Sequence, residues 1–400
     1  MNHQKTKVVV AGAGPVGAVA AFFLAQRNVD VVLLECTENN AQDLRASTFH
    51  PPTLEMFDEL GIADSLIAKG LKAPIFHFRE RQTGEVIDFD LSEIADVTKF
   101  PFRIQCEQYH LSRMLSEALE KNDKAQVLFN HRVVGFHQHQ EGVQVFAETP
   151  EKIVRIDADF LIGADGSNSI IRKWLETDFT GFTYPEKFLC FSTPEPLEQK
   201  IPNLSYVNYV SDPNEWQVLL RVPSLWRVLV PAGEEQTDEF LTSDGYKNEV
   251  FDRLIGNGDA VETKHRTIYR VHQRVAKKFV HDRVIIIGDA AHLNNPIGGF
   301  GMNSGIHDAI NLCEKLEQMY KGGDADALLG KFERQRYKTT HDFIQTQTMR
   351  NMEYLAQGDR SEHELRKSEM QRQRSDDTLR RTYLLRQSMI ESLEQQKAIA

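Results

Sequence analysis

Short apolar runs occur at four places along the chain, and each is followed within two residues by a glycine or an acidic residue. The runs cover residues 8–11, 29–34 (interrupted by Asp30), 160–163 and 284–287. Apolar runs of this length are typical of strands buried on both faces of a parallel sheet. Between the first two runs, residues 18–26 follow a helical pattern. The chain is therefore predicted to contain an α/β domain with a parallel sheet.

A different pattern fills residues 74–100 and 180–272, where apolar and polar residues alternate in short segments such as 75–79, 205–210, 215–222 and 226–230. A period of two predicts strands with one buried face, so we expect an antiparallel sheet inserted into the α/β domain. The α/β domain would then comprise residues 1–73, 101–179 and 273–350. The inserted domain would comprise residues 74–100 and 180–272, and residues 351–400 would form a C-terminal helical extension.

The C-terminal extension becomes rich in Arg, Gln, Glu and Ser from about Ser361. Five apolar residues in it fall close to helical spacing: Leu379, Tyr383, Met389, Ile390 and Leu393. This spacing predicts an amphipathic helix over residues 376–396, whose apolar stripe must be buried. We expect the stripe to pack on the chain's own body, with dimerisation as the alternative. Balanced charges disfavour a membrane surface.

The composition narrows the class of protein. A chain of 400 residues with 41% hydrophobic residues can bury a large core, and a net charge of −11 disfavours nucleic-acid binding. The four cysteines are far apart, so neither a disulfide framework nor a metal site is predicted.

One N-terminal feature superficially resembles a signal peptide, because Lys5 and Lys7 precede an apolar stretch over residues 8–25. Three glycines and Pro15 interrupt this stretch. No other segment approaches the roughly 18 continuous apolar residues that a membrane span needs. We therefore expect a cytoplasmic protein with no membrane partner.

The first apolar run leads into a glycine-rich turn, Gly12-Ala-Gly14-Pro15-Val16-Gly17. In such a GxGxxG turn the first glycine permits the tight bend, the second admits a pyrophosphate, and the third lets the helix pack on the strand. Glu35 ends the second strand, where it can accept a hydrogen bond from a ribose hydroxyl. A dinucleotide site is therefore predicted from Gly12, Gly14, Pro15, Val16, Gly17 and Glu35.

A second glycine-rich segment follows the run at residues 284–287. Its candidate cofactor residues are Gly288, Asp289, Pro296, Gly299, Gly301, Met302 and Asn303. Asp289 lies just beyond the strand and can hydrogen-bond a sugar-like hydroxyl. A helix is expected to begin near Asn303, which would direct its free N–H groups and positive dipole end at an anion such as a reduced flavin. His292 is expected to have a structural role.

A third motif, Asp165-Gly166, ends the run at residues 160–163 and precedes a helix that contains Arg172. The series of GxGxxG, Asp-Gly and Gly-Asp before a glycine-rich loop resembles that of the single-component (group A) flavoprotein aromatic hydroxylases, the family of para-hydroxybenzoate hydroxylase and phenol hydroxylase. The resemblance covers residues 7–338. It implies a Rossmann-like, GR2-type FAD-binding domain of the para-hydroxybenzoate hydroxylase fold.

The resemblance also implies roles for individual residues around a non-covalent FAD. Glu35 is similar to the ribose ligand, Arg45 to a cofactor or nicotinamide contact, and Gln108 to a residue near the phosphate or ribityl chain. Asp165 and Gly166 resemble residues that link pyrophosphate and nicotinamide recognition, and Asp289 the ribityl ligand. Residues 301–303 would supply backbone donors to the flavin pyrimidine edge, and the carbonyl of Pro296 would face the reactive flavin carbon.

The implied reaction begins with reduction of FAD by NADH or NADPH. Dioxygen would then form a flavin C4a-hydroperoxide that hydroxylates a phenolic or N-heteroaromatic small molecule, with or without a carboxylate group. The sequence contains no second GxGxxG after a strand. The nicotinamide nucleotide would therefore bind transiently across the FAD domain.

The substrate side is less determined by the sequence. If residues 223–225 form the whole turn, Arg221 lies opposite Arg227, either as a clamp for a substrate anion or as two solvated arginines. Four aromatic residues are candidates for lining a pocket, with core packing as the alternative: Tyr206, Tyr209, Trp216 and Trp226. Three histidines are candidates for assisting phenol deprotonation: His50, His77 and His272.

Other functions of the same fold remain open at this point. A flavin-dependent halogenase would carry a Trp-x-Trp-x-Ile-Pro motif, which the chain lacks. An epoxidising oxidoreductase and a flavin-bearing protein without turnover are further alternatives. The sequence does not select the aromatic substrate, NADH or NADPH, or a monomer over a homodimer.

Overall fold

The nucleotide-binding half of the molecule is built on a mainly parallel six-stranded sheet. The computed structural model describes residues 3–40, 46–212, 214–355 and 360–400. The strand order is β19 (Val280–His281), β20 (Val284–Ile286), β13 (Phe160–Gly163), β2 (Val8–Ala11), β3 (Val31–Leu34) and β9 (Ala125–Leu128). All neighbours are parallel except β19 and β20. The four apolar runs therefore form the four central strands, as predicted.

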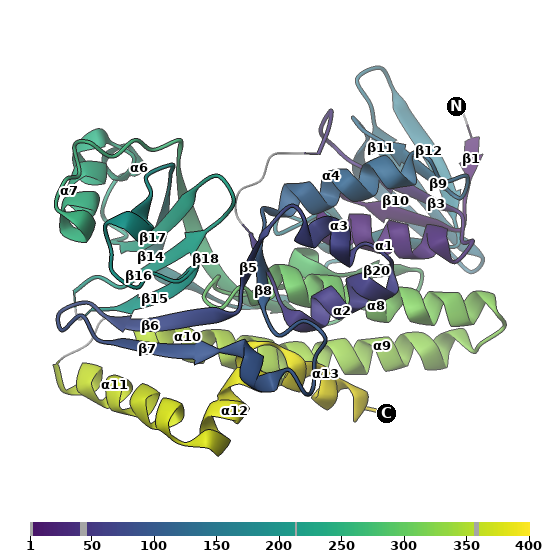
Figure 1. Cartoon of the computed structure of the whole chain (residues 1–400). Helices are drawn as coiled ribbons and strands as arrows, with labels where there is room; N and C mark the ends of the chain where they lie inside the picture. Colours follow the sequence, from purple (N-terminus) through teal and green to yellow (C-terminus); the bar gives the residue numbers. More distant parts are fainter. Residues whose placement is uncertain (1–2, 41–45, 213, 356–359) are drawn as a thin grey trace.

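Helices cover this sheet and bury its apolar residues. α1 (Pro15–Gln26) packs against α4 (Gln108–Leu119) and the long α8 (Phe300–Tyr320), and α9 (Ala325–Thr339) packs on α8 (Figure 1). A four-stranded sheet continues the same half, in the order β1 (His3–Lys5), β12 (Ile153–Ala158), β11 (Gly142–Glu148) and β10 (Arg132–His139). The short α5 (Ile170–Trp174) follows β13.

The inserted half is an eight-stranded sheet. Its order is β21 (His292–Leu293), β18 (His265–Ala276), β14 (Phe179–Thr193), β17 (Trp226–Ala232), β16 (Gln217–Arg221), β15 (Val207–Ser211), β6 (Ile75–Glu80) and β7 (Val86–Asp90). The predicted antiparallel pairing holds except between β15 and β6, which run parallel. The β6–β7 hairpin comes from a separate segment of the chain, so no tight turn requires β6 and β15 to be antiparallel. Helices α6 (Asp238–Leu241) and α7 (Asp244–Ile255) lie at the outer end of this half (Figure 1).

A small sheet lies where the two halves meet. It consists of β4 (Thr48–Phe49), β8 (Arg103–Gln105) and β5 (Leu71–Ala73), with β8 in the middle. Helices α2 (Pro51–Glu59) and α3 (Ala63–Ile67) connect β4 to β5. Short 3-10 turns occur at Leu91–Ile94, Leu197–Gln199 and Gly288–Ala290.

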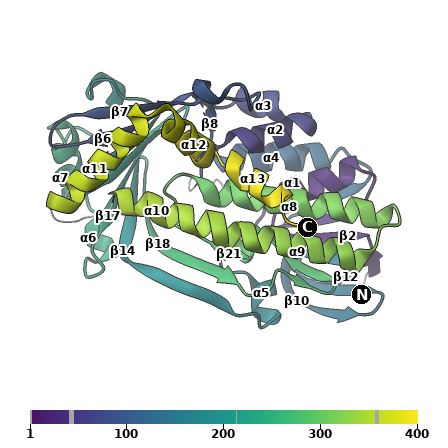
Figure 2. The same ribbon diagram turned by 90° about the horizontal axis from the view of Figure 1, so that it is seen from below.

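The C-terminal segment packs along both halves of its own chain. After α9, a π-helical turn (Thr340–Gln345) leads into α10 (Thr346–Leu355), then α11 (Arg360–Ser375), α12 (Asp377–Gln387) and α13 (Ile390–Lys397). α11 packs on β7, and α13 packs on α9 and α2 (Figure 2). The predicted packing on the chain's own body is confirmed: Met389 and Ile390 of the stripe are buried, and Leu379, Tyr383 and Leu393 are half-buried. Leu384, which the prediction did not include, is also buried.

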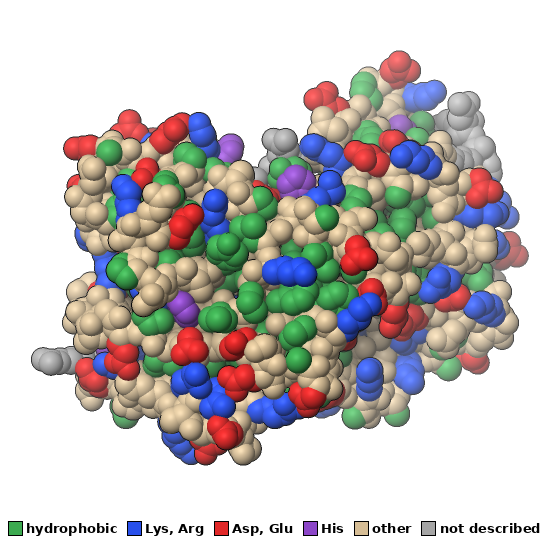
Figure 3. Space-filling view, viewed as in Figure 1, with side chains coloured by type: hydrophobic (Ala, Val, Ile, Leu, Met, Phe, Trp, Pro, Cys, Tyr) green, Lys and Arg blue, Asp and Glu red, His purple; other side chains and the backbone are tan. Residues whose placement is uncertain are grey.

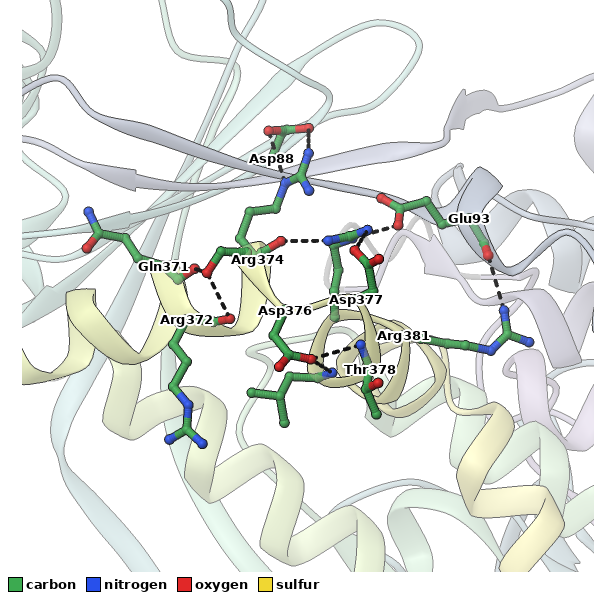
Figure 4. Close-up of polar contacts among 12 residues, drawn as sticks. Asp88, Glu93, Gln371, Arg372, Arg374, Asp376, Asp377, Thr378 and Arg381 are labelled. Carbon is green, nitrogen blue, oxygen red and sulfur yellow. Dashed lines mark hydrogen bonds and ion pairs between the residues drawn. The ribbon is translucent and has the colours of Figure 1, made fainter.

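The single helix predicted over residues 376–396 is wrong in one respect. It is broken into α12 and α13 at Ser388 and Met389, because Met389 adopts a left-handed conformation with φ of 67°. Ion pairs attach α11 and α12 to the inserted half: Arg374 of α11 pairs with Asp88 (Figure 4), and Arg380 and Arg381 of α12 pair with Glu93 and Asp96.

Charged side chains of both signs are interspersed over the face shown in Figure 3, including its lower margin, where the C-terminal helices lie. Among the described residues, none of the helices combines the length and the apolar character that crossing a bilayer requires.

Candidate functional site

Two adjoining cavities lie at the carboxyl ends of the central strands. The glycine-turn cavity has a volume of about 260 Å³ and is lined by Gly14, Pro15, Val16, Glu35, Asn40, Gln108 and Gly166, among others. The sheet cavity has a volume of about 340 Å³ and lies between the eight-stranded sheet and the loop at residues 296–301. Ala46, Asp289 and Met302 line both. Two predicted cofactor residues, Asp289 and Met302, therefore lie at the junction.

The glycine turn has the geometry that a phosphate group needs. Gly12 has φ of 100°, and a Cβ there would lie 2.4 Å from the carbonyl oxygen of Ala164. A Cβ on Gly17 would lie 2.0 Å from the carbonyl oxygen of Gly12. Gly14 instead has open space where a Cβ would be, and it caps α1 without a side-chain hydrogen bond. The first turn of α1 therefore faces the cavity with backbone alone.

Other predicted cofactor residues lie around this turn. Glu35 accepts hydrogen bonds from the backbone N–H of Ala13 at 2.9 Å and of Thr37 at 3.1 Å. Gln108 begins α4 and lines the cavity. Arg45 falls outside the described residues.

Asp165 has a role that the sequence did not predict. Its carboxylate accepts hydrogen bonds from the Ser169 hydroxyl at 2.6 Å and from the backbone N–H of Ile170 at 2.8 Å. It thereby holds the start of α5, while the neighbouring Gly166, with φ of 79°, lines the glycine-turn cavity.

A buried ionic network supports the turn at Gly288 and Asp289. The Gly288 N–H donates to the Asp308 carboxylate at 3.0 Å, and Arg336 and His292 bind the same carboxylate at 2.6 and 2.8 Å. Burial alone would raise the pKa of Asp308, but Arg336 and His292 lower it to about 2. His292 thus has the predicted structural role. Asp308 and Arg336 were missed, although an acid in the middle of an apolar helix was a usable signal.

The loop before α8 is held by Asn303. Its side-chain oxygen accepts a hydrogen bond from the backbone N–H of His50 at 3.0 Å. Its side-chain NH2 group donates to the backbone carbonyls of Thr48 and Gly299 at 2.8 and 2.7 Å. The helix begins at Phe300, three residues before the predicted start, because Gly299 caps it in the left-handed conformation. Gly301 and Met302, in its first turn, line the sheet cavity.

Pro296 lines the sheet cavity, and its carbonyl accepts from the Gly299 N–H at 3.0 Å. His50 does not line this cavity. Its Nε2 bonds the Gly298 carbonyl at 2.8 Å, and burial together with Arg103 holds its pKa well below the usual range.

The sheet contributes the remaining wall. The lining includes apolar residues Val218, Leu220, Leu229 and Val271, and polar residues Tyr209, Arg227, Tyr269 and His272. Arg227 is buried and donates to Ser47 Oγ at 3.3 Å and Tyr269 OH at 3.4 Å. Burial alone would lower the pKa of Arg227, but Cys190 and Tyr269 outweigh it and the pKa is raised. Arg227 therefore places a permanent positive charge in the wall.

The predicted pairing of Arg221 with Arg227 is wrong. Val222 and Leu225 hydrogen-bond each other, so the turn is Pro223-Ser224 and the register moves by one residue. Arg221 lies opposite Trp226, and Arg227 lies opposite Leu220. The Arg221 side chain donates to the Val222 carbonyl and does not line the sheet cavity.

The other aromatic candidates separate in the same way. Tyr209 lines the cavity, whereas Tyr206 is exposed. Trp216 and Trp226 are fully buried in the core. His77 lies on β6, outside the cavity lining. Several lining residues carried no local signal, among them Ser47, Tyr269 and Asn294, because they come from segments far apart in the sequence.

The donor groups fit FAD. The glycine turn presents an uncapped helix start for a pyrophosphate, Glu35 and Asp289 are acids placed for hydroxyl groups, and α8 presents a second helix start to the sheet cavity. The two cavities join at Asp289, so an elongated dinucleotide can extend through both.

Known proteins share this arrangement. A family model described as FAD binding domain matches residues 5–351. The chain is 31% identical to the 6-hydroxy-3-succinoylpyridine 3-monooxygenase of Pseudomonas putida, over 88% of this chain and 89% of that protein. It is 29% identical to the para-nitrophenol 4-monooxygenase of a Pseudomonas species, over 88% of each.

A solved structure of a monooxygenase is also similar to this chain. The crystal structure of a p-nitrophenol 4-monooxygenase from Pseudomonas putida aligns with a TM-score of 0.92 at 28% identity, covering 98% of this chain and 99% of that one. Sequence motifs, cavity geometry and relatives thus agree, and the chain belongs to the FAD-binding family of flavin-dependent aromatic monooxygenases, with FAD as its cofactor.

Proposed function

We propose that the protein uses NADH or NADPH and dioxygen to hydroxylate a small phenolic or N-heteroaromatic compound that binds in the sheet cavity and carries an anionic group. The observation that carries this proposal is the position of Arg227, a buried cation in the lining of the sheet cavity, whose other arginine, Arg270, is exposed. Bound FAD would supply the redox chemistry, passing electrons from the nicotinamide to dioxygen and an oxygen atom to the ring.

The loop at residues 296–301 and the N-terminus of α8 would hold the flavin ring. The N-terminus of α8 carries a positive partial charge, which stabilises negative charge on a reduced ring by roughly 0.3 to 2 kcal/mol. Its first turn reaches the cavity at Gly301 and Met302. Pro296 and Gly299 line the same side, where we place the flavin edge and the reacting carbon of the substrate.

The sheet excludes water and orients the substrate. Val218, Leu220 and Leu229 form an apolar wall opposite the loop. A dry wall limits side reactions of reactive oxygen species with water. Arg227, with Ser47 and Tyr269 beside it, would bind a carboxylate, nitro or phenolate oxygen and so fix which ring carbon faces the loop.

His272 is the histidine that we assign to proton transfer. It lines the cavity, and its Nδ1 lies 2.8 Å from the Thr183 hydroxyl. Burial and the nearby Arg274 lower its pKa, so the ring is neutral at pH 7 and can accept the phenol proton. Deprotonation makes the ring more electron-rich at the carbon to be hydroxylated.

The relatives support the substrate class. Their names specify a nitrophenol and a succinoyl-substituted hydroxypyridine, both small hydroxylated rings with a polar substituent. The test is a panel of phenols, hydroxybenzoates and hydroxypyridines, scored by NAD(P)H consumption, hydrogen peroxide and product mass. A gain of one oxygen atom supports hydroxylation. Incorporated halide would favour halogenase chemistry, and no turnover with any compound would favour a flavin-bearing binding protein.

The anion assignment has its own test. Arg227→Met should raise KM for the best anionic substrate by about tenfold to a hundredfold, the range for a charge-assisted hydrogen bond, and leave FAD content unchanged. Arg221→Met removes the same charge on the adjacent strand, outside the cavity, and should leave KM unchanged. Equal KM values in both variants and the wild type would contradict the role of Arg227.

A further inference from the structure

Gln387, a buried residue of the C-terminal segment, is connected to the sheet cavity through its hydrogen-bond partners. It is the last residue of α12 and lies just before the break at Met389. Its side-chain amide pairs with that of Asn351 on α10. Gln387 donates to Asn351 Oδ1 at 2.6 Å, and Asn351 Nδ2 donates back at 3.3 Å. Both amides are buried, so this pair replaces hydrogen bonds to water.

Asn351 connects Gln387 to the loop at residues 296–301, which we call the flavin loop. Its Nδ2 also donates to the Ile297 carbonyl at 3.3 Å. A Cβ on Gly298 would lie 2.6 Å from the same nitrogen, so the amide lies directly against the loop. His50 bonds the Gly298 carbonyl at 2.8 Å. Ile297 and Gly298 both line the sheet cavity. The loop is therefore tethered at two neighbouring carbonyls, and Gln387 supports one of these tethers.

The backbone of Gln387 makes a second connection. Its carbonyl accepts a hydrogen bond from Arg103 Nη2 at 3.2 Å, and Arg103 Nη1 donates to the Tyr209 hydroxyl at 3.3 Å. Arg103 is fully buried, and its guanidinium lies 4.4 Å from the centre of the Phe76 ring. Tyr209 lines the sheet cavity opposite the loop. The two branches from Gln387 therefore end on two parts of one cavity lining, the loop at residues 296–301 and strand β15 of the sheet.

We propose that Gln387 is a positioning residue for the hydroxylation site. It sets the distance between the flavin loop, through Asn351, and the Tyr209 side of the substrate wall, through Arg103. The second half of this statement rests on the proposed function, because it assumes that a substrate lies between these walls. The first half concerns the flavin environment alone. A shift of either wall would leave the ring misplaced relative to the oxygen source, so NAD(P)H oxidation would yield more hydrogen peroxide and less product.

The test uses the full-length FAD-loaded protein with Gln387→Met, which keeps the side-chain length, removes the side-chain hydrogen bonds to Asn351 and leaves the backbone carbonyl that Arg103 binds. The matched control is Gln395→Met, the same change in α13 at an exposed side chain that bonds Glu391. The first readout is visible circular dichroism of the bound flavin without substrate, which reports the surroundings of the ring. The second is the product-to-peroxide ratio with para-nitrophenol or the best compound of the panel.

For Gln387→Met we expect an altered flavin spectrum, unchanged FAD stoichiometry and a product-to-peroxide ratio lower by about two- to tenfold, the range for one or two neutral hydrogen bonds. Gln395→Met should match the wild type in all three. An altered spectrum would still be expected if no compound were hydroxylated, so failure of the proposed function would be distinguishable.

If Gln387→Met does not fold, Asn351→Ala tests the loop branch, and the same spectral change is expected. A wild-type spectrum together with a wild-type ratio in a folded variant would overturn the proposal. A lower melting temperature with both readouts unchanged would also overturn it, because it would show that Gln387 only stabilises the fold.

Discussion

The two cavities share three lining residues but are built from different parts of the chain. The glycine-turn cavity is lined mainly by residues that follow the parallel strands β2, β3, β13 and β20 and by the first turns of α4. The sheet cavity is lined by side chains from β15 to β18 and by the loop before α8, and the C-terminal segment supports it from outside. We therefore expect recognition of the cofactor to depend mainly on the turns that follow the strands, and recognition of the substrate to depend on strand register and long-range packing. Changes in the two regions should therefore have separable effects.

The largest effect is expected from truncation after Gln373, which affects the sheet cavity first. It removes the buried side chains of Leu384, Met389 and Ile390, each of which stabilises the fold by about 1.5 to 3 kcal/mol. The expected result is a much lower melting temperature, measured by calorimetry, with every described residue of the glycine-turn cavity still present. The oligomeric state, measured as the mass in solution, distinguishes packing on the chain's own body from dimerisation. A truncated protein with unchanged stability and an unchanged oligomeric state would contradict packing of the segment on its own chain.

Asp308→Asn should damage both cavities, because Asp308 lies beneath their junction at Gly288 and Asp289. Removing one partner of a buried ion pair costs about 3 to 5 kcal/mol. Urea unfolding measures the loss, with Asp342→Asn, at an exposed pair with Lys338, as the control.

The same network predicts a pH dependence. The pKa of Asp308 is lowered to about 2, so its ionised form stabilises the folded state at pH values above its ordinary pKa. This contribution should be lost as the pH falls from about 4 towards 2. Stability of the wild type should therefore fall more steeply over this range than that of Asp308→Asn. Parallel curves would contradict the assignment.

Substitutions of two glycines in the glycine turn should separate an effect on stability from an effect on FAD binding. Gly12→Ala forces a side chain into a left-handed conformation, at a cost of about 1 to 3 kcal/mol before its contact with Ala164 is counted. Gly14→Ala meets no protein atom within 4 Å, so the apoprotein should keep its melting temperature while FAD binds more weakly. If Gly14→Ala bound FAD as tightly as the wild type, the open space at Gly14 would not be the pyrophosphate position.

The same difference explains what the sequence could predict. The central strands, the glycine turn and the position of Glu35 could be predicted from contiguous residues, because their geometry is set within one βαβ unit. The Arg221 register was wrong because it depends on a turn that is one residue shorter than assumed. The break at Met389 carries no glycine signal, since a non-glycine residue adopts the left-handed conformation there. Contacts such as that between His50 and Asn303 join residues 253 positions apart and leave no local pattern.

The smallest effect is expected at Glu35, and it should be confined to the glycine-turn cavity. Glu35→Ala removes the proposed ribose acceptor and the bond to the Ala13 N–H. A hydrogen bond to a charged group contributes about 1.5 to 3 kcal/mol, so FAD affinity should fall by about tenfold to a hundredfold, measured by flavin fluorescence titration. Glu38→Ala removes the same charge at an exposed position three residues further on and should bind FAD like the wild type.

At saturating FAD, KM for the substrate should be unchanged in Glu35→Ala, because no wall of the sheet cavity has moved. A rise in KM would show that the two regions are coupled through Ala46, Asp289 and Met302. Unchanged FAD affinity would contradict the ribose assignment.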